Sequence, residues 1–537
     1  MIVAFVGCAG ASPDRSAGAG PVSPGPGATG MEAAREAQVL PQGSTPVAPA
    51  NSDGTSAAEV ALQVSPEAPL SEKAVADDGR PRLAAIDHFA YIYRKPAREG
   101  LALGYIRLGT SVPLLSDQPV QGAGCPRGFY RVAPRGYACL DYRTTLDLQD
   151  PTYVALSRRA PDPDAVWPYQ YAFSNGAPMY SRLPTLEEQE KAEQRFGPPG
   201  SFVQLAEWSR GHEELLTTAP IAASHPAPED VFDGHRRKVG SGLRNPKTLV
   251  WRVIPNGSML AYAEAFEALG RVWLLTPDLM VVPADRVRAV KRSQFKGVTL
   301  GQGLELPLAW NRTHDPKPKY RRSEEGVVRE AGGVSAKSPV AILEPRVTIG
   351  KRAFFELRDE PGVLVDEADV TVSRTRPELP RGVSPGSKWI EVKILPGTLT
   401  AYEGNRPVYA TLFSPGKGGV PVPGHDHTRY ATTATGFFPV EWKERAATMS
   451  NEKYGEPKVL WFTDVPAIQY LKAPLALHVA YWHEDFGNPK SAECVNVSAL
   501  DGHWLFGWTD PALPEGWGAM RPGGGNGPST PVIVSAM

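Results

Sequence analysis

Residues Ser491 to Phe506, "SAECVNVSALDGHWLF", contain the only cysteine that follows Cys139 in this chain of 537 residues. A single cysteine is more often a small buried apolar side chain than a reactive group. Its thiol becomes a nucleophile only where neighbouring groups stabilise the thiolate. The segments before Cys494 therefore decide which role the sequence predicts.

A regular order of strand and turn signals precedes this stretch. The segment starting at Lys388, "KWIEVKILPGTLTAYEGNRPVYATLF", predicts two strands that meet at Glu403-Gly-Asn405, where the residues tolerate left-handed backbone. A second turn follows at residues 433–437, "TATGF". The apolar run "LALHVAYWH" then predicts a strand that carries His478.

This order resembles the L,D-transpeptidase catalytic domain, also called the YkuD domain, from Lys388 to about Trp517. The turn at 433–437 is similar to the family's Thr-Pro-Thr-Gly turn, and residues 491–496 are similar to its Ser-His-Gly-Cys-x-Asn motif. The resemblance covers about a quarter of the chain. It implies a catalytic β-sandwich over residues 388–520 in a chain that is mainly β.

The resemblance also implies a reaction. In this family a cysteine attacks a peptidoglycan stem peptide between its third residue, a diamino acid, and the D-Ala at position four. An amine of another stem peptide, or of a lipoprotein lysine, then takes the acyl group, and water in place of the amine would make a carboxypeptidase. Cys494 matches the nucleophile, and His478 matches the base that a thiol of ordinary pKa needs at neutral pH.

Further positions match supporting roles in the family. The backbone N–H groups of Glu493 and Cys494 are expected to form the oxyanion hole, while Ser491 and Asn496 brace the loop. Three residues after His478 are candidates for lining the site: Tyr481, Trp482 and His483. No cofactor or metal is expected, because the pair His425 and His427 has no third ligand nearby and is typical of a solvated loop.

Four positions depart from the family pattern. Ala492 stands where the motif has His, Glu493 where it has Gly, Val479 where a Gly usually follows the histidine, and Ala434 replaces a proline. A carboxylate at Glu493 would raise the pKa of the neighbouring thiol and oppose an oxyanion. If this position needs positive φ, a non-glycine residue would add about 1–2 kcal/mol of strain.

The N-terminal part has a different character. The start "MIVAFVGC" resembles a lipobox, which implies a lipidated Cys8 after a signal remnant at residues 1–8. Residues 9–82 contain no aromatic residue and are rich in Ala, Pro, Gly and Ser, which predicts a disordered tether. This layout predicts a periplasmic protein of the cell envelope, held at a membrane by a lipid anchor. The balanced charge, 57 basic and 58 acidic residues, argues against a nucleic-acid partner.

Short alternating runs broken by Gly and Pro begin at residue 83 and predict β-structure. Three echoes of one pattern, at residues 128–143, 270–288 and 351–372, resemble small SH3-like barrels. We expect one module at 83–150, a connecting region at 151–240, one or two modules at 241–372, and a disordered tail at 521–537. Cys125 and Cys139 flank a hairpin-like segment, which favours a disulfide over a metal pair because no His lies nearby.

Two functions of different classes follow. The first is a periplasmic L,D-transpeptidase whose partners are peptidoglycan stem peptides and a possible lipoprotein acceptor. The second is an impaired, peptidoglycan-binding envelope protein that keeps the fold. The residues before Cys494 make the activity of the first kind weak.

Overall fold

The computed structural model describes residues 79–198, 215–240, 248–323, 328–450 and 460–537. The predictions for Cys8 and for most of the tether lie outside these residues. Within them, no helix is long and apolar enough to cross a membrane. Strands predominate throughout the described chain, so the prediction of a mainly β protein is confirmed.

The first region holds a three-stranded sheet of order β4-β1-β8, and its strands β3-β2-β7-β6-β5 form one end of a larger sheet. In β2 the side chains of Ala90 and Ile92 are buried and those of Tyr91 and Tyr93 are partly exposed, as expected for a half-buried strand. The structure joins Cys125 and Cys139 in a disulfide with a Cα–Cα distance of 5.8 Å. The strands are β1 (Arg82–Ala85), β2 (Ala90–Tyr93), β3 (Ala102–Ile106), β4 (Ser111–Pro113), β5 (Val120–Gly122), β6 (Cys125–Arg131), β7 (Tyr137–Cys139) and β8 (Thr144–Thr145).

The second region includes much of the segment that we expected to be a connector. Strands β9 and β10 from that segment pair with β15 and β14 and share buried cores with them, so the prediction of a mere connecting region is wrong. A capping box formed by Thr185 and Glu188 is present at the start of α2. The elements are α1 (Pro151–Ser157), β9 (Gln170–Ser174), β10 (Ala177–Tyr180), α2 (Leu186–Glu193), β11 (His225–Pro226), β12 (Phe232–Asp233), β13 (Arg236–Arg237), β14 (Val250–Ile254), β15 (Met259–Tyr262), β16 (Glu264–Ala268), β17 (Arg271–Leu275), β18 (Val281–Pro283), the 3-10 helix η3 (Ala284–Arg286) and β19 (Val287–Ala289).

The third region has its own core and forms two sheets, β24-β21-β28 and β23-β22-β27-β26-β25. Its second half repeats the order strand, strand, 3-10 helix, strand that ends the second region. The sequence echo between residues 270–288 and 351–372 thus corresponds to a shared local structure. The elements are β21 (Leu308–Trp310), β22 (Lys317–Arg322), β23 (Val328–Val334), β24 (Pro339–Ala341), β25 (Val347–Ile349), β26 (Arg352–Glu356), β27 (Val363–Asp366), η4 (Glu367–Asp369) and β28 (Thr371–Ser373).

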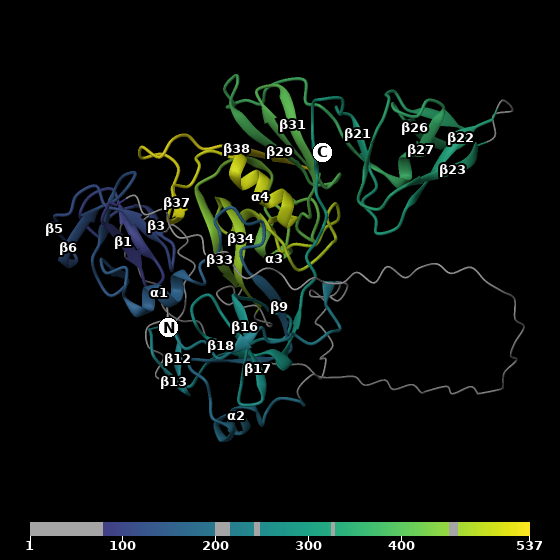
Figure 1. Ribbon diagram of the computed structural model, residues 1–537. Coiled ribbons are helices and arrows are strands. Elements are labelled where there is room, and N and C mark those ends of the chain that lie inside the picture. Colours follow the sequence, from purple (N-terminus) through teal and green to yellow (C-terminus); the bar gives the residue numbers. More distant parts are fainter. Residues whose placement is uncertain (1–78, 199–214, 241–247, 324–327, 451–459) are drawn as a thin grey trace, which may run out of the picture. The chain divides into compact units, whose positions relative to one another are not determined.

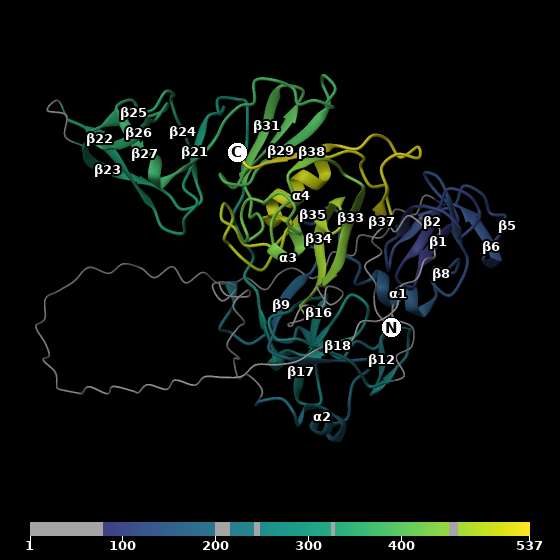
Figure 2. The ribbon, with the colours of Figure 1, turned by 180° about the vertical axis from the view of Figure 1, so that it is seen from behind.

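The C-terminal region is built on two sheets with an apolar core and the helix α4 between them (Figures 1 and 2). One sheet has the order β20-β31-β30-β29-β38-β32, and the other contains β33 to β36. The predicted hairpin at Glu403-Gly-Asn405 joins β30 to β31. The elements are β20 (Val298–Thr299), β29 (Lys388–Lys393), β30 (Thr398–Glu403), β31 (Arg406–Leu412), α3 (His427–Tyr430), β32 (Gly436–Pro439), β33 (Trp442–Ser450), β34 (Trp461–Lys472), β35 (Leu475–Val479), β36 (Val495–Val497), α4 (Ala499–Trp508), β37 (Trp517–Met520) and β38 (Pro531–Ser535).

The last residues differ from the expected disordered tail. Strand β38 lies between β29, with which it pairs in parallel, and the edge strand β32, with which it pairs antiparallel. Val532 and Val534 bury their side chains in the core. The prediction of disorder at 521–537 is therefore wrong over β38, because a short apolar strand follows the Gly-rich run.

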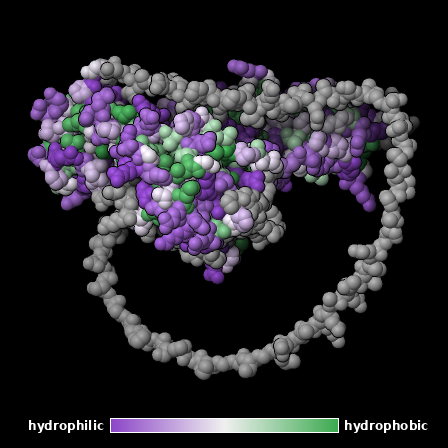
Figure 3. All heavy atoms as spheres, turned by 60° about the horizontal axis from the view of Figure 1, so that its bottom comes forward, coloured by the Kyte–Doolittle hydropathy of each residue, from purple (hydrophilic) through white to green (hydrophobic). Residues whose placement is uncertain are grey.

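Strand pairing also links the regions to one another. β37 lies between β33 and β3 of the first region, and β15 of the second region pairs with β34. The hydroxyl of Tyr105 on β3 donates to Glu444 on β33 at 2.6 Å. Hydrophilic residues predominate on the face drawn in Figure 3, where hydrophobic residues gather in one patch near the centre of the view.

Candidate active site

Two neighbouring strands position the predicted dyad. β35 and β36 run parallel, and their register places His478 opposite Asn496. Cys494 lies immediately before β36, and β35 follows the turn at Pro474 that joins it to β34 (Figure 2). All residues of both strands are buried; β35 lies between β34 and β36, and β36 pairs with β35. Backbone pairing therefore places the base candidate on one strand and the nucleophile candidate directly before its neighbouring strand.

His478 is buried and both its ring nitrogens have partners. Nδ1 donates to the carbonyl oxygen of Val479 at 2.9 Å, and the side-chain amide of Asn496 donates to Nε2 at 3.0 Å. Burial lowers the pKa of His478 to about 4, so the ring is neutral at pH 7. It carries its proton on Nδ1 and a lone pair on Nε2, which is the form that a general base requires.

Cys494 is the free cysteine of the described residues, and it is partly exposed. Its sulfur donates to the carbonyl oxygen of Pro474 at 3.6 Å, and within the described structure no hydrogen bond joins it to His478. Burial of the sulfur raises the pKa of the thiol to about 12, and the Glu493 carboxylate adds to the rise, while the N–H of Ala476 opposes it. The resting side chain is a thiol.

Glu493 does not turn its carboxylate to solvent. The residue is 7% exposed, and the hydroxyl of Thr428 on α3 donates to its carboxylate at 3.2 Å. Burial raises the pKa of the Glu493 carboxyl group. The hydrogen bond from Thr428 opposes this rise, and the nearby Asp426 adds to it. The backbone of Glu493 is not in the left-handed region, so the strain considered for a non-glycine residue here does not arise.

Side-chain hydroxyls brace the loop that carries the cysteine. Ser491 donates to the carbonyl oxygen of Cys494 at 2.6 Å, and Thr433 donates to that of Glu493 at 2.8 Å. Thr433 in turn accepts from the N–H of Gly416. These bonds fix the carbonyl groups of the loop. The assignment of the N–H groups of Glu493 and Cys494 to an oxyanion hole stays a prediction.

The three candidate lining residues have different surroundings. Tyr481 packs in the core, where its ring stacks on Tyr171 at 3.9 Å, and its hydroxyl donates to a backbone carbonyl. Trp482 is partly exposed, and its ring centre lies 5.8 Å from that of His478. His483 is fully buried and lies 3.5 Å from the side chain of Asn496. Only Trp482 and His483 therefore contact the residues of the dyad or their partners.

Asp501 is a buried carboxyl group that sequence reasoning missed. It lies in the first turn of α4 and accepts from the hydroxyls of Tyr409 and Thr411, each at 2.6 Å, and from the N–H of Gly297 at 2.7 Å. Ser498 caps the helix by accepting from the N–H of Asp501. A Ser followed by Asp three positions later is a helix-start signal that could have revealed the turn, but not the distant donors.

The two loop histidines, His425 and His427, contact neighbouring side chains of their own loop. His425 stacks on the ring of Tyr430 at 4.5 Å, and Nδ1 of His427 lies 3.0 Å from the hydroxyl of Thr432. Within the described ranges, no group of three His, Cys, Asp or Glu side chains could hold a metal ion.

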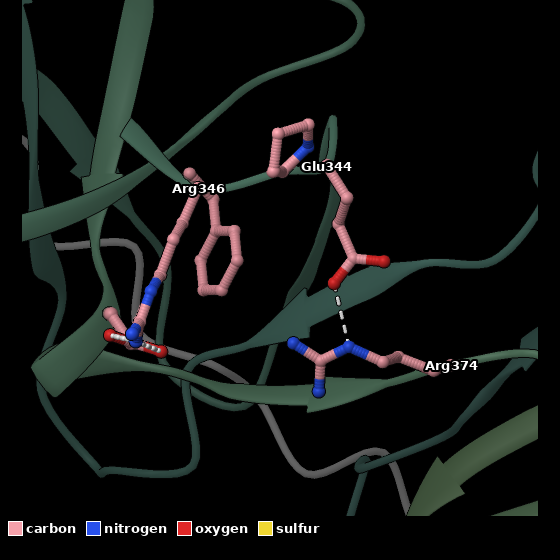
Figure 4. A pocket seen from close by; sticks show the side chains of 6 residues that line it. Glu344, Arg346 and Arg374 are labelled. Atoms are coloured by element: carbon pink, nitrogen blue, oxygen red, sulfur yellow. Dashed lines mark hydrogen bonds and ion pairs between the residues drawn. The ribbon is translucent and has the colours of Figure 1, made fainter. Parts of the chain in front are cut away.

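An open pocket of about 490 Å³ lies in the third region, away from the cysteine loop (Figure 4). Arg346 pairs with Glu367, and Arg374 donates to Glu344 at 2.6 Å. Each guanidinium is paired with a carboxylate, and neither Cys494 nor His478 lines this pocket. The pocket is therefore separate from the candidate active site.

Residues 387–534 match the family model of the L,D-transpeptidase catalytic domain, YkuD. The solved structures to which the chain is similar include the following three. The first is the L,D-transpeptidase of Xylanimonas cellulosilytica, with 24% identity over 30% of this chain and 64% of that one, and a TM-score of 0.20. The second is the catalytic domain of the E. faecium L,D-transpeptidase, with 20% identity over 28% of this chain and all of that one, and a TM-score of 0.20. The third is the Mycobacterium smegmatis L,D-transpeptidase, with 15% identity over 37% of this chain and all of that one, and a TM-score of 0.22.

The chain thus spans less than two thirds of the X. cellulosilytica structure. These TM-scores are too low for the structural similarities to support a conclusion by themselves. No curated protein matches the chain. The C-terminal region is therefore assigned by the family model, which includes Cys494, His478 and β38 within its matched residues.

Proposed function

We propose that this protein is a cysteine-dependent L,D-transpeptidase of low resting activity that acts on peptidoglycan stem peptides. The observation that carries the proposal is a strand pairing inside the matched domain: β35, which carries a neutral His478, runs parallel to β36, which Cys494 immediately precedes. The lone pair on Nε2 of this histidine can accept the thiol proton. A base of this kind is what a cysteine nucleophile requires.

The first half of the reaction forms an acyl-enzyme. The thiol proton passes from the sulfur of Cys494 to Nε2 of His478 as the sulfur bonds to the carbonyl carbon of the third stem residue. The C–N bond to D-Ala then breaks, and the leaving amine takes the proton from the imidazolium. The product is a thioester on Cys494 and free D-Ala.

The second half transfers the acyl group. The amine of a second stem peptide attacks the thioester carbonyl, loses its proton through His478 to the departing sulfur, and forms a 3→3 crosslink. A lipoprotein lysine in place of the stem amine would attach that protein to the wall. Both acceptors use the same acyl-enzyme.

Two hydrogen bonds oppose the first step. The thiol is bonded to the carbonyl of Pro474, and Nε2 of His478 is bonded to the amide of Asn496. A thiol with a pKa of about 12 is ionised to roughly one part in 10⁵ at pH 7. Substrate binding must therefore rearrange these bonds before the thiol reacts, which is the physical reason for a low resting activity.

The proposal includes a place in the cell envelope. The disulfide between Cys125 and Cys139 supports it, because disulfides persist in oxidising compartments such as the periplasm. In this picture Cys8 carries a lipid anchor, the segment between Cys8 and β1 acts as a tether, and the SH3-like modules hold peptidoglycan near the catalytic domain.

The proposal is tested by incubating the full chain with disaccharide-tetrapeptide muropeptides and analysing the products by liquid chromatography and mass spectrometry. We expect slow formation of 3→3 crosslinked dimers with release of D-Ala, and none from a Cys494→Ala variant. Release of D-Ala with tripeptide alone would assign water as the acceptor. No D-Ala release under any condition would overturn the proposal.

A second candidate is a peptidoglycan-binding protein that has lost catalysis. The buried carboxylate of Glu493 next to the sulfur favours it, because negative charge there opposes both a thiolate and an oxyanion. It predicts that the full chain binds purified sacculi equally well with and without Cys494→Ala, while no product forms with either.

A further inference from the structure

A line of four hydrogen bonds runs through the buried side of the site. The N–H of Asp485 donates to Nδ1 of His483 at 3.2 Å, and Nε2 of His483 lies 3.5 Å from the side-chain oxygen of Asn496. The amide nitrogen of Asn496 lies 3.0 Å from Nε2 of His478, whose Nδ1 lies 2.9 Å from the carbonyl oxygen of Val479. The line therefore connects two backbone groups through three buried side chains.

The two ends determine the direction of every bond between them. A backbone N–H can only donate, so Nδ1 of His483 has no proton and Nε2 of that ring carries it. A backbone carbonyl can only accept, so Nδ1 of His478 is protonated and Nε2 is not. Asn496 fits between them in one orientation, with its oxygen toward His483 and its NH₂ toward His478. Each end thus favours the same arrangement of the three side chains.

We propose that His483 is a positioning residue that fixes the side-chain amide of Asn496 and, through it, holds His478 as the Nδ1–H tautomer with its lone pair on Nε2. The inference deepens the proposed function, on which it rests, because it names the group that keeps the base in its reactive form. His483 itself contacts neither the sulfur of Cys494 nor any reacting atom.

The surroundings of His483 show how its ring is held. Its ring lies 5.0 Å from that of Phe486, and the following segment is fixed by Asp485, which pairs with Lys490 at 3.0 Å and with His314 at 3.2 Å. The hydroxyl of Ser414 donates to the carbonyl of Asp485. The N–H that directs the line therefore belongs to a residue anchored from three sides.

A purely packing role for His483 would give a different result on substitution. The bond to Asn496 is the longest of the four, and without it the amide can rotate so that its oxygen faces Nε2 of His478. The rotated amide oxygen accepts a hydrogen bond from a protonated Nε2 of His478 and so favours the Nε2–H tautomer. This bond competes with the one from Nδ1–H to the carbonyl oxygen of Val479. Loss of the Nε2–H of His483 should thus mix the tautomers of His478, even where the core stays packed.

The test reads the tautomer directly, without substrate. The full chain is labelled with ¹⁵N-histidine, and the ring nitrogens are followed by long-range ¹H–¹⁵N NMR near pH 7, with a His478→Gln variant to assign the signals of that ring. Three variants are compared: His483→Gln, which can place an amide N–H near the position of Nε2, His483→Asn, which is too short to reach Asn496, and His483→Leu, which removes both nitrogens.

We expect the unaltered chain and His483→Gln to show a protonated Nδ1 on His478, and His483→Asn and His483→Leu to show at least a fifth of the Nε2–H form. Circular dichroism and thermal melting verify folding, and the Asn variant decides the matter if the Leu variant does not fold. A wild-type tautomer ratio in the folded loss variants would overturn the inference. A tautomer change in a protein that never releases D-Ala would leave the inference standing and remove the proposed function.

Discussion

Glu493 and Asp501 are two buried carboxyl groups in one stretch of sequence, and they are held very differently. Asp501 receives hydrogen bonds from two hydroxyls and a backbone N–H, all at 2.7 Å or less, whereas Glu493 receives one from Thr428 at 3.2 Å. Asp501 joins the segment before β20 to the catalytic scaffold. Glu493 lies next to Cys494, and its carboxylate adds to the rise that burial causes in the pKa of the thiol. The carboxyl group on the scaffold helix α4 thus has three hydrogen-bond donors, while the one beside Cys494 has a single, longer bond from a side chain.

The largest expected effect comes from breaking the satisfied carboxyl. Asp501→Ala leaves three buried donors without an acceptor, and each costs about 1–3 kcal/mol, so we expect the free energy of unfolding of the C-terminal region to fall by roughly 3–5 kcal/mol. Calorimetry of the full chain measures this change in the free energy of unfolding. Asp510→Ala is the control, because it removes a partly exposed ion pair with Lys388 and should cost less than about 1 kcal/mol. Equal losses in both variants would contradict the comparison.

The reactivity of Cys494 should depend steeply on pH. Because its pKa is raised to about 12, the thiolate is the minor form throughout pH 7–10, and the rate of alkylation by iodoacetamide should rise about tenfold per pH unit over this range. Mass spectrometry of the peptide that contains Cys494 follows the reaction. A rate that levels off near pH 8.5 would show an ordinary thiol and refute the effect of burial.

Removing the charge of Glu493 should make the cysteine more reactive. A like charge a few ångströms away raises a thiol pKa by roughly one unit, and part of the gained thiolate is offset by lower nucleophilicity, so Glu493→Gln should speed alkylation about three- to tenfold at pH 8. Glu493→Asp keeps the charge and serves as the matched control, with a change below about twofold. If both variants react like the unaltered chain, the carboxylate has no influence on the sulfur.

The smallest effect is expected at the single donor to Glu493. Thr428→Val removes a hydrogen bond that lowers the pKa of this carboxyl group, so the pKa rises further above its unfolded value. A folded state that holds its proton more tightly loses stability as pH rises, so the loss appears at pH 7 and fades near pH 4. We expect less than about 1 kcal/mol at pH 7 from urea unfolding. A larger loss at pH 4 than at pH 7 would contradict this sign.

The sequence predicted the parts of the site that depend on local order. The hairpin at Glu403-Gly-Asn405 and the strand that carries His478 each have a short-range signal. The line from His483 to His478 could not be predicted, because it depends on a parallel register between β35 and β36 and on the orientation of one amide. Sequence resemblance supplied candidates for the dyad but not their hydrogen-bond partners.

Long-range strand pairing was the main source of error in the fold. Nothing local indicates that β9 belongs with β15, or that β38 inserts between β29 and β32 after a Gly-rich segment. Composition made both segments resemble linkers. Similarly, Asp501 is a charged residue on a short helix, and its burial follows only from Gly297 and Tyr409, which are distant in the sequence.

The central claim is that Cys494 forms an acyl-enzyme despite its raised pKa. The most direct measurement is the intact mass of the full chain during incubation with a disaccharide-tetrapeptide and no acceptor, followed by hydroxylamine. We predict a slowly accumulating adduct with the mass of the disaccharide-tripeptide acyl group, located on Cys494, released by hydroxylamine and absent from Cys494→Ala. No adduct after prolonged incubation, in a protein that still binds sacculi, would contradict the claim.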